Sequence, residues 1–120
     1  MKRIIFGAGF LVAAVASLPA SAANQSICTA VTTAGNGAAV AVGSFVKVTF
    51  TPKCSANVFL TGNDQNANLY TVGAASIKGK SYFDGSSAGG AVRRVGDCGG
   101  TNGVCRQDDA NTGATSAPSS

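Results

Sequence analysis

Few residues in this 120-residue chain are of the types that do chemistry. Histidine is absent, and the five acidic residues are all aspartates: Asp64, Asp84, Asp97, Asp108 and Asp109. Without an imidazole, Ser-His-Asp and Cys-His hydrolases and histidine-ligated metals are excluded. A paired-aspartate site is the carboxylate chemistry that remains, but Asp108 and Asp109 lie where we expect no preorganised structure. The sequence therefore predicts a protein that is not an enzyme, with no catalytic residues, cofactor or metal.

The four cysteines predict a covalent framework. They are Cys28, Cys54, Cys98 and Cys105, and an even number in a small exported domain is typical of two disulfides. The glycine-rich segment 99–104 can turn and bring Cys98 close to Cys105. We therefore favour Cys98–Cys105, which leaves Cys28 to pair with Cys54. No C-x2-C or C-x4-C spacing supports a zinc site or a redox-active dithiol.

Four basic side chains lie on segments that we expect to be neighbours: Lys78, Lys80, Arg93 and Arg94. Lys78 and Lys80 are two residues apart, which places them on one face of a strand. With Tyr82 available for stacking, this candidate patch could bind a polyanion such as lipopolysaccharide, extracellular DNA or an acidic glycan. The alternative, which we favour, is that these charges keep strands soluble and protect sheet edges.

The spacing Asp64-x-Asn66-x-Asn68 resembles the first half of a calcium-binding loop. The second half does not match. Leu69 occupies the position of the required glycine, and Ala75 occupies the position of the bidentate glutamate. We therefore expect an ordinary polar turn.

The N-terminus has the pattern of a secretory signal. Lys2 and Arg3 precede an uncharged stretch at 4–18, and Ala-Ser-Ala follows at 20–22. Fifteen residues are fewer than the roughly 20 that span a bilayer, so we predict a cleaved signal peptide at 1–22 and no membrane span after cleavage. The short signal is typical of bacteria, and we expect a periplasmic, extracellular or cell-surface protein.

Cleavage also lowers the net charge. Removing two of the nine basic residues leaves seven against five acidic ones, or +2. This charge is too small to predict sequence-specific binding of nucleic acid.

The elements that would position these residues are short strands. Apolar residues alternate with polar ones, most clearly at 45–50, and Asn36-Gly37 is a strong hairpin signal. Helical periodicity and glutamate are both absent. The pattern predicts an all-β domain at 23–105, a small antiparallel β-sandwich or open barrel of about six short strands. The expected strands are 26–33, 39–52, 57–61, 69–72, 77–83 and 91–95.

No large apolar residue follows Val104. Residues 106–120 then bury too little surface to offset their ordering entropy. We expect them to form a disordered tail.

Two functional hypotheses follow from the composition and the strand pattern. The first is an exported non-enzymatic structural or surface-interaction protein, such as a filament or coat subunit that associates through strand edges with itself or with another surface protein. Here 23–33 is the segment that we expect to exchange. The alternative is a monomeric secreted binding module for a polyanion or glycan that uses loops 62–68 and 84–90 and the basic residues. A small inhibitor or effector acting through the Cys98–Cys105 loop is a third hypothesis.

Overall fold

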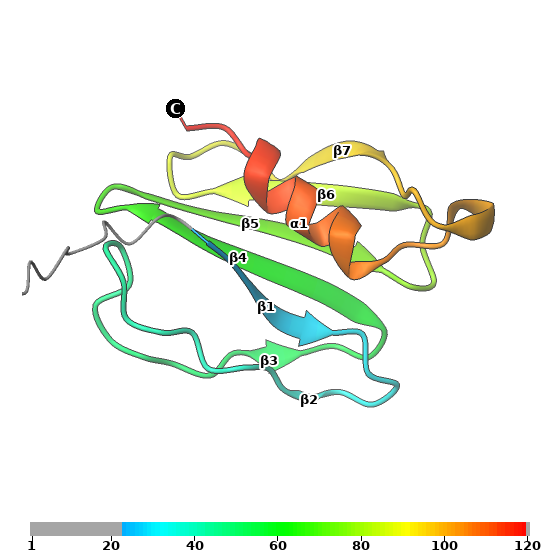
Figure 1. The fold of residues 1–120 in the computed structure, drawn as a ribbon, viewed down its shortest axis with the longest axis horizontal. Coiled ribbons are helices and arrows are strands. Elements are labelled where there is room, and N and C mark those ends of the chain that lie inside the picture. The colour runs from blue at the N-terminus through cyan, green and yellow to red at the C-terminus, as the bar shows by residue number, and fades with distance from the viewer. Residues whose placement is uncertain (1–22, 120) are drawn as a thin grey trace, which may run out of the picture.

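The computed structural model describes residues 23–119, so the predicted signal peptide lies outside the described residues. Most of its regular secondary structure is β-strand (Figure 1). A five-stranded antiparallel sheet has the order β1-β4-β5-β6-β7, and β2 and β3 form a small second sheet. The elements are β1 (Asn24–Thr29), β2 (Gly35–Asn36), β3 (Lys53–Cys54), β4 (Val58–Asn66), β5 (Leu69–Ser76), β6 (Ser81–Ser86), β7 (Arg93–Asp97), a 3-10 turn η1 (Thr101–Gly103) and α1 (Gln107–Ser116).

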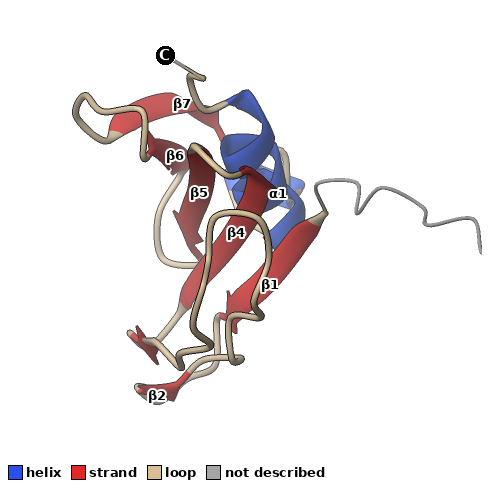
Figure 2. Ribbon diagram, turned by 90° about the vertical axis from the view of Figure 1, so that its left-hand side faces the viewer, coloured by secondary structure: helices blue, strands red, loops and turns tan. Residues whose placement is uncertain are grey.

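The central strand β5 defines the two faces of the large sheet. Its residues alternate between buried and half-buried from Leu69 to Ser76, as expected of a strand whose side chains point to opposite faces. One face lies against α1, as Figure 2 shows. Thr71 and Gly73 belong to this helix face, since both contact α1, whereas Tyr70 belongs to the opposite face.

The face opposite α1 carries the main apolar cluster. It contains the Cys28–Cys54 disulfide, with the two Cα atoms 5.7 Å apart, together with Ile27, Val40 and Val46. Leu60 and Tyr70 of the large sheet pack against the cluster. The segment between β1 and β4 therefore covers part of this face, and the disulfide ties that segment to β1.

The predicted antiparallel fold and both disulfide pairings are confirmed. The second layer differs from the two packed sheets of a sandwich. In residues 23–119 one large sheet has a helix on one face and a loop segment with the two-stranded sheet β2-β3 on the other. Single alternating strands do not reveal what covers each face of a sheet.

The prediction of a disordered tail is wrong for residues 107–116, which form α1. Burial here comes from small side chains, because Ala110 and Ala114 are both 0% exposed. A Cβ on Gly73 would lie 1.9 Å from the carbonyl oxygen of Ala110, and one on Gly113 would lie 2.6 Å from the carbonyl oxygen of Phe83. The helix thus packs directly against the sheet backbone, which large apolar residues would prevent.

Hydrogen bonds anchor α1 to the sheet. The Thr71 hydroxyl donates to the Ala114 carbonyl oxygen over 2.7 Å. The Thr61 hydroxyl donates to Asn111 Oδ1 over 2.7 Å and accepts from Gln107 Nε2 over 2.8 Å. Both threonines are 0% exposed, and buried hydroxyls need such partners because burial removes their hydrogen bonds to water. The interface is consequently polar and directional.

Candidate functional site

The five residues of the candidate basic patch do not share one face. Arg93 pairs with Asp84, with Nε 3.0 Å from Oδ1 and a terminal nitrogen 2.5 Å from Oδ2. The side-chain hydrogen bond to Asp84 raises the pKa of Arg93, and the charge of Asp84 adds to this effect, whereas burial opposes it. Asp84 itself is only 2% exposed. Arg93 therefore neutralises a buried carboxylate on the helix side of the sheet.

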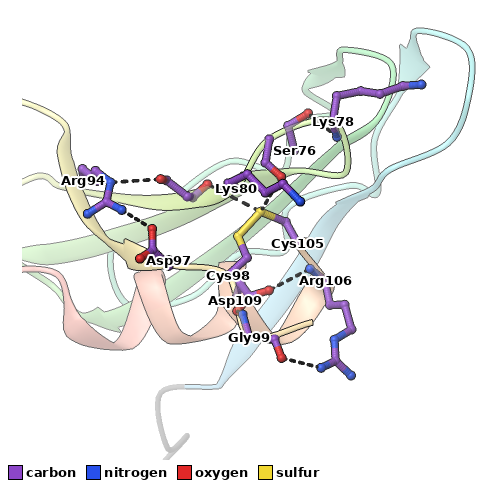
Figure 3. Close-up of a disulfide and its surroundings, with 12 residues drawn as sticks. Ser76, Lys78, Lys80, Arg94, Asp97, Cys98, Gly99, Cys105, Arg106 and Asp109 are labelled. Atoms are coloured by element: carbon purple, nitrogen blue, oxygen red, sulfur yellow. Dashed lines mark hydrogen bonds and ion pairs between the residues drawn. A yellow bond between two sulfur atoms is a disulfide. The ribbon is translucent and has the colours of Figure 1, made fainter. Parts of the chain in front are cut away.

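Arg94 lies on the opposite face. It donates to the Ser81 hydroxyl over 2.9 Å and forms an ion pair with Asp97. Lys80 donates to the Asn102 carbonyl oxygen beside the Cys98–Cys105 disulfide. Figure 3 shows Lys78 projecting away from this cluster. The structure therefore separates the two arginines, and polyanion binding stays a prediction.

Tyr82, the predicted stacking residue, packs against the second apolar cluster. This cluster joins Ala75 to Cys98 and Cys105, with Phe59 also in contact. Tyr82 thus contributes to the packing around the disulfide. It lies on the same side of the sheet as Asp84, two residues along β6.

The Cys98–Cys105 disulfide, with its Cα atoms 4.8 Å apart, connects the end of β7 to the start of α1 (Figure 3). Asp109 accepts from the backbone N–H of Gly99 over 3.0 Å and from that of Arg106 over 2.8 Å. The two sulfur atoms and the Asp109 carboxylate lie within 4.8 Å of one another. Because the sulfurs are bonded to each other, they offer no thiolates to a metal. The arrangement positions α1 rather than forming a metal centre.

The two loops of the binding-module hypothesis meet at one end of the sheet. The Ser87 hydroxyl donates to the carbonyl oxygen of Asn68 over 3.5 Å and accepts from the backbone N–H of Tyr70, at the start of β5, over 2.9 Å. The loops are shorter than expected, because 62–66 belongs to β4 and 84–86 to β6. The contact supports a common position for these loops and leaves their binding role a prediction.

Asp64 anchors a loop instead of occupying a calcium-type ring. Its carboxylate accepts from the backbone N–H of Phe45 over 2.9 Å and from that of Val46 over 2.9 Å. Asn66 Oδ1 accepts from the Asn68 N–H over 2.9 Å, which closes the polar turn. The side chains of the Asp-x-Asn-x-Asn pattern are therefore occupied by backbone donors.

A cleft of about 190 Å³ lies beside this anchor. Asp64 and Tyr70 contribute to its wall, and the rings of Phe45 and Tyr70 pack with centroids 5.8 Å apart. Burial raises the pKa of Tyr70, and the negative charge of Asp64 raises it further. A Cβ on Gly62 would lie 2.0 Å from the Tyr70 hydroxyl, so a larger residue at this position would require the Tyr70 ring to shift. The lining of the cleft holds one carboxylate, Asp64, whose oxygens accept from two backbone N–H groups of the loop, and it holds no lysine or arginine.

The Asp64→Ala variant should release the loop around Phe45 and Val46. Two backbone donors would lose a charged acceptor, which costs roughly 1–3 kcal/mol of unfolding free energy. Amide hydrogen exchange should show lost protection at Phe45 and Val46, with little change at Thr71. Unchanged protection at the two loop amides would contradict the anchoring role.

The two outer edges of the large sheet differ. At β1, the Ile27 carbonyl oxygen accepts from the Ala38 N–H over 2.8 Å, and the Gln25 side chain binds the Ala39 carbonyl oxygen. The middle of the segment expected to exchange, 23–33, is thus bonded on its outer side at Gln25 and Ile27 and tied down through Cys28. Exchange of this segment would break those contacts.

At β7, by contrast, the sheet ends, and no other segment of residues 23–119 pairs with this strand. The Cys98 N–H donates to the Lys80 carbonyl oxygen over 2.8 Å. Backbone groups alternate along an antiparallel edge strand, so those of the preceding residue, Asp97, point outward. Sequence reasoning missed this edge because strand order is not visible in the chain.

Compared with protein-family models, curated proteins and solved structures, the chain shows no match. Within the described range, no helix is long and apolar enough to cross a membrane. The two disulfides are consistent with an exported protein in an oxidising compartment.

Proposed function

We propose that this protein is an exported, non-enzymatic structural or surface-interaction protein that associates through a strand edge. The observation that carries the proposal is the edge strand β7, which no other segment of 23–119 covers. An unpaired edge presents a row of backbone donors and acceptors that an extended strand can complete. The rigid support behind β7 favours this role.

Three interactions provide that support. Antiparallel pairing with β6 holds one side of the strand, and the Arg93–Asp84 pair fixes its beginning. The Cys98–Cys105 disulfide follows its last residue. A preorganised edge loses little conformational entropy when a partner strand binds.

The test compares two substitutions at one position. Asp97→Pro removes the carboxylate and the outward N–H, whereas Asp97→Ala removes the carboxylate alone. Sedimentation equilibrium of the oxidised exported protein should show concentration-dependent association of wild type. The proline variant should dissociate further than the alanine variant, because only proline removes a ladder hydrogen bond.

Circular dichroism and urea unfolding serve as the control that both variants remain folded. A wild-type protein that is monomeric at every concentration would reject association with itself. It would also favour the alternative, a monomeric binding module, whose two loops meet at Asn68 and Ser87. Equal dissociation by the two variants would show that the backbone edge is not the contact.

A further inference from the structure

The direction of the two edge strands limits how copies of this sheet can join. Each neighbouring pair in β1-β4-β5-β6-β7 is antiparallel, so β1 and β7 run in the same direction. Continuing the sheet from β7 of one copy to β1 of another, with both copies in the same orientation, would require a parallel junction. The outer side of β1 is already bonded to Ala38. The remaining antiparallel solution joins two equivalent β7 strands.

We propose that β7 pairs with β7 of a second copy about a twofold axis, with Arg94 of each chain opposite Asp97 of the other. This inference rests on the proposed edge association and names its partner. A twofold contact is self-complementary, so each ion pair occurs twice. The result is a closed pair with a continuous ten-stranded sheet, and not an open filament.

The irregular pairing of β7 with β6 places the two charges on one face. Arg94 lies opposite Phe83 and Asp97 lies opposite Ser81. Phe83 and Ser81 are two residues apart and share a face of β6. Arg94 and Asp97, which lie opposite them on β7, therefore also share a face. In a regular strand, residues three apart would point to opposite faces. The register shift between Tyr82 and Phe83 supplies the extra residue in β7.

Both charged side chains remain accessible to a second copy. The Arg94 side chain is 52% exposed and that of Asp97 is 82% exposed. Within one chain Arg94 and Asp97 pair with each other. In the antiparallel pair, Arg94 of each copy instead meets Asp97 of the other copy. Val95 then faces Gly96 of the second copy, and glycine leaves room for the valine side chain.

Charge also accounts for the selectivity of such an edge. Arginines and a bulge are common devices that discourage indiscriminate strand pairing. Opposite charges in cross-strand positions stabilise one register, and like charges destabilise it. Among antiparallel registers, the one centred between Val95 and Gly96 brings Arg94 to Asp97 twice.

The test uses charge reversal with rescue. Arg94→Asp alone, or Asp97→Arg alone, places like charges across the axis twice and should weaken self-association at least about tenfold. An equimolar mixture of the two variants restores two opposite-charge pairs and should associate about as tightly as wild type. The double variant Arg94→Asp/Asp97→Arg should also associate, since its charges are exchanged within each chain.

Sedimentation velocity of each variant, the mixture and wild type distinguishes the outcomes. A monomeric wild type would reject the proposed edge association itself. Association of wild type without rescue in the mixture, or with all variants unaffected, would retain the edge proposal and reject the twofold register. Circular dichroism of each single variant checks that it folds, and the double variant provides a second test if one single variant does not.

Discussion

Replacing Gly73 with alanine should separate α1 from the sheet and destabilise the protein strongly. The added Cβ would lie 1.9 Å from the Ala110 carbonyl oxygen and 2.3 Å from the Ala114 backbone nitrogen. Both are backbone atoms, which cannot rotate away as a side chain can. We expect a loss of about 3 kcal/mol in unfolding free energy, measured by urea unfolding.

Gly79→Ala is the matched control. A Cβ at Gly79 would meet its nearest neighbour, the Ser76 carbonyl oxygen, at 3.5 Å, an ordinary contact distance. Its effect should stay within about 0.5 kcal/mol. Amide exchange should also show α1 losing protection in the Gly73 variant only. Equal stability of the two variants would show that α1 does not pack closely on β5.

Removing the Cys28–Cys54 disulfide should cost more than removing Cys98–Cys105. The first closes a sequence separation of 26 residues and the second one of 7. The chain-entropy relation gives about 3.5 kcal/mol for the longer closure and about 2.5 kcal/mol for the shorter. The longer disulfide also lies within the main apolar cluster, so the difference should be at least this large.

Urea unfolding of two double-serine variants, Cys28→Ser/Cys54→Ser and Cys98→Ser/Cys105→Ser, measures this order. The shorter disulfide should affect α1 more locally, because Asp109 and Arg106 bind Gly99 within its loop. Amide exchange of α1 separates this local effect from global stability. A larger global loss from the second variant would contradict the assignment of the main core to Cys28–Cys54.

The parts of the fold that follow from local pattern were predictable. Short strand-forming segments indicated an antiparallel β-protein, and the glycine-rich turn between Cys98 and Cys105 indicated their pairing. The strand expected at 39–52 was wrong, because this segment, where alternation is clearest, forms a loop with one isolated bridge between Val40 and Phe50. These signals are local, because a turn closes over a few residues and alternation is a property of one strand.

Helix α1 was missed because its burial has no apolar signature. Ala110, Gly113 and Ala114 pack through the absence of large side chains. The facing residues, Thr61 and Thr71, are buried polar groups that pair with the helix. The sequence does not show that small and hydroxyl side chains in α1 would fit a face of β5 that carries threonine and glycine. Only the contact in three dimensions shows it.

The positions of the charged side chains in the candidate site depend on strand order and on the bulge in β7, and neither is visible in the sequence. Adjacent arginines point to opposite faces, so Arg93 binds Asp84 while Arg94 binds Asp97. Asp84 lies nine residues before Arg93, and nothing in the sequence marks it as buried. The sequence analysis expected association through 23–33, whereas in the structure the open edge of the large sheet is β7. The sequence does not reveal which strands lie at the edges of a sheet.

Amide exchange of the wild-type protein over a range of concentrations tests the role of β7 most directly. Asp97 and Cys98 are neighbours whose N–H groups point in opposite directions, since that of Cys98 binds Lys80. We predict that protection of the Asp97 amide rises with protein concentration while that of Cys98 stays constant. An Asp97 exchange rate that is fast and independent of concentration would contradict association through this edge.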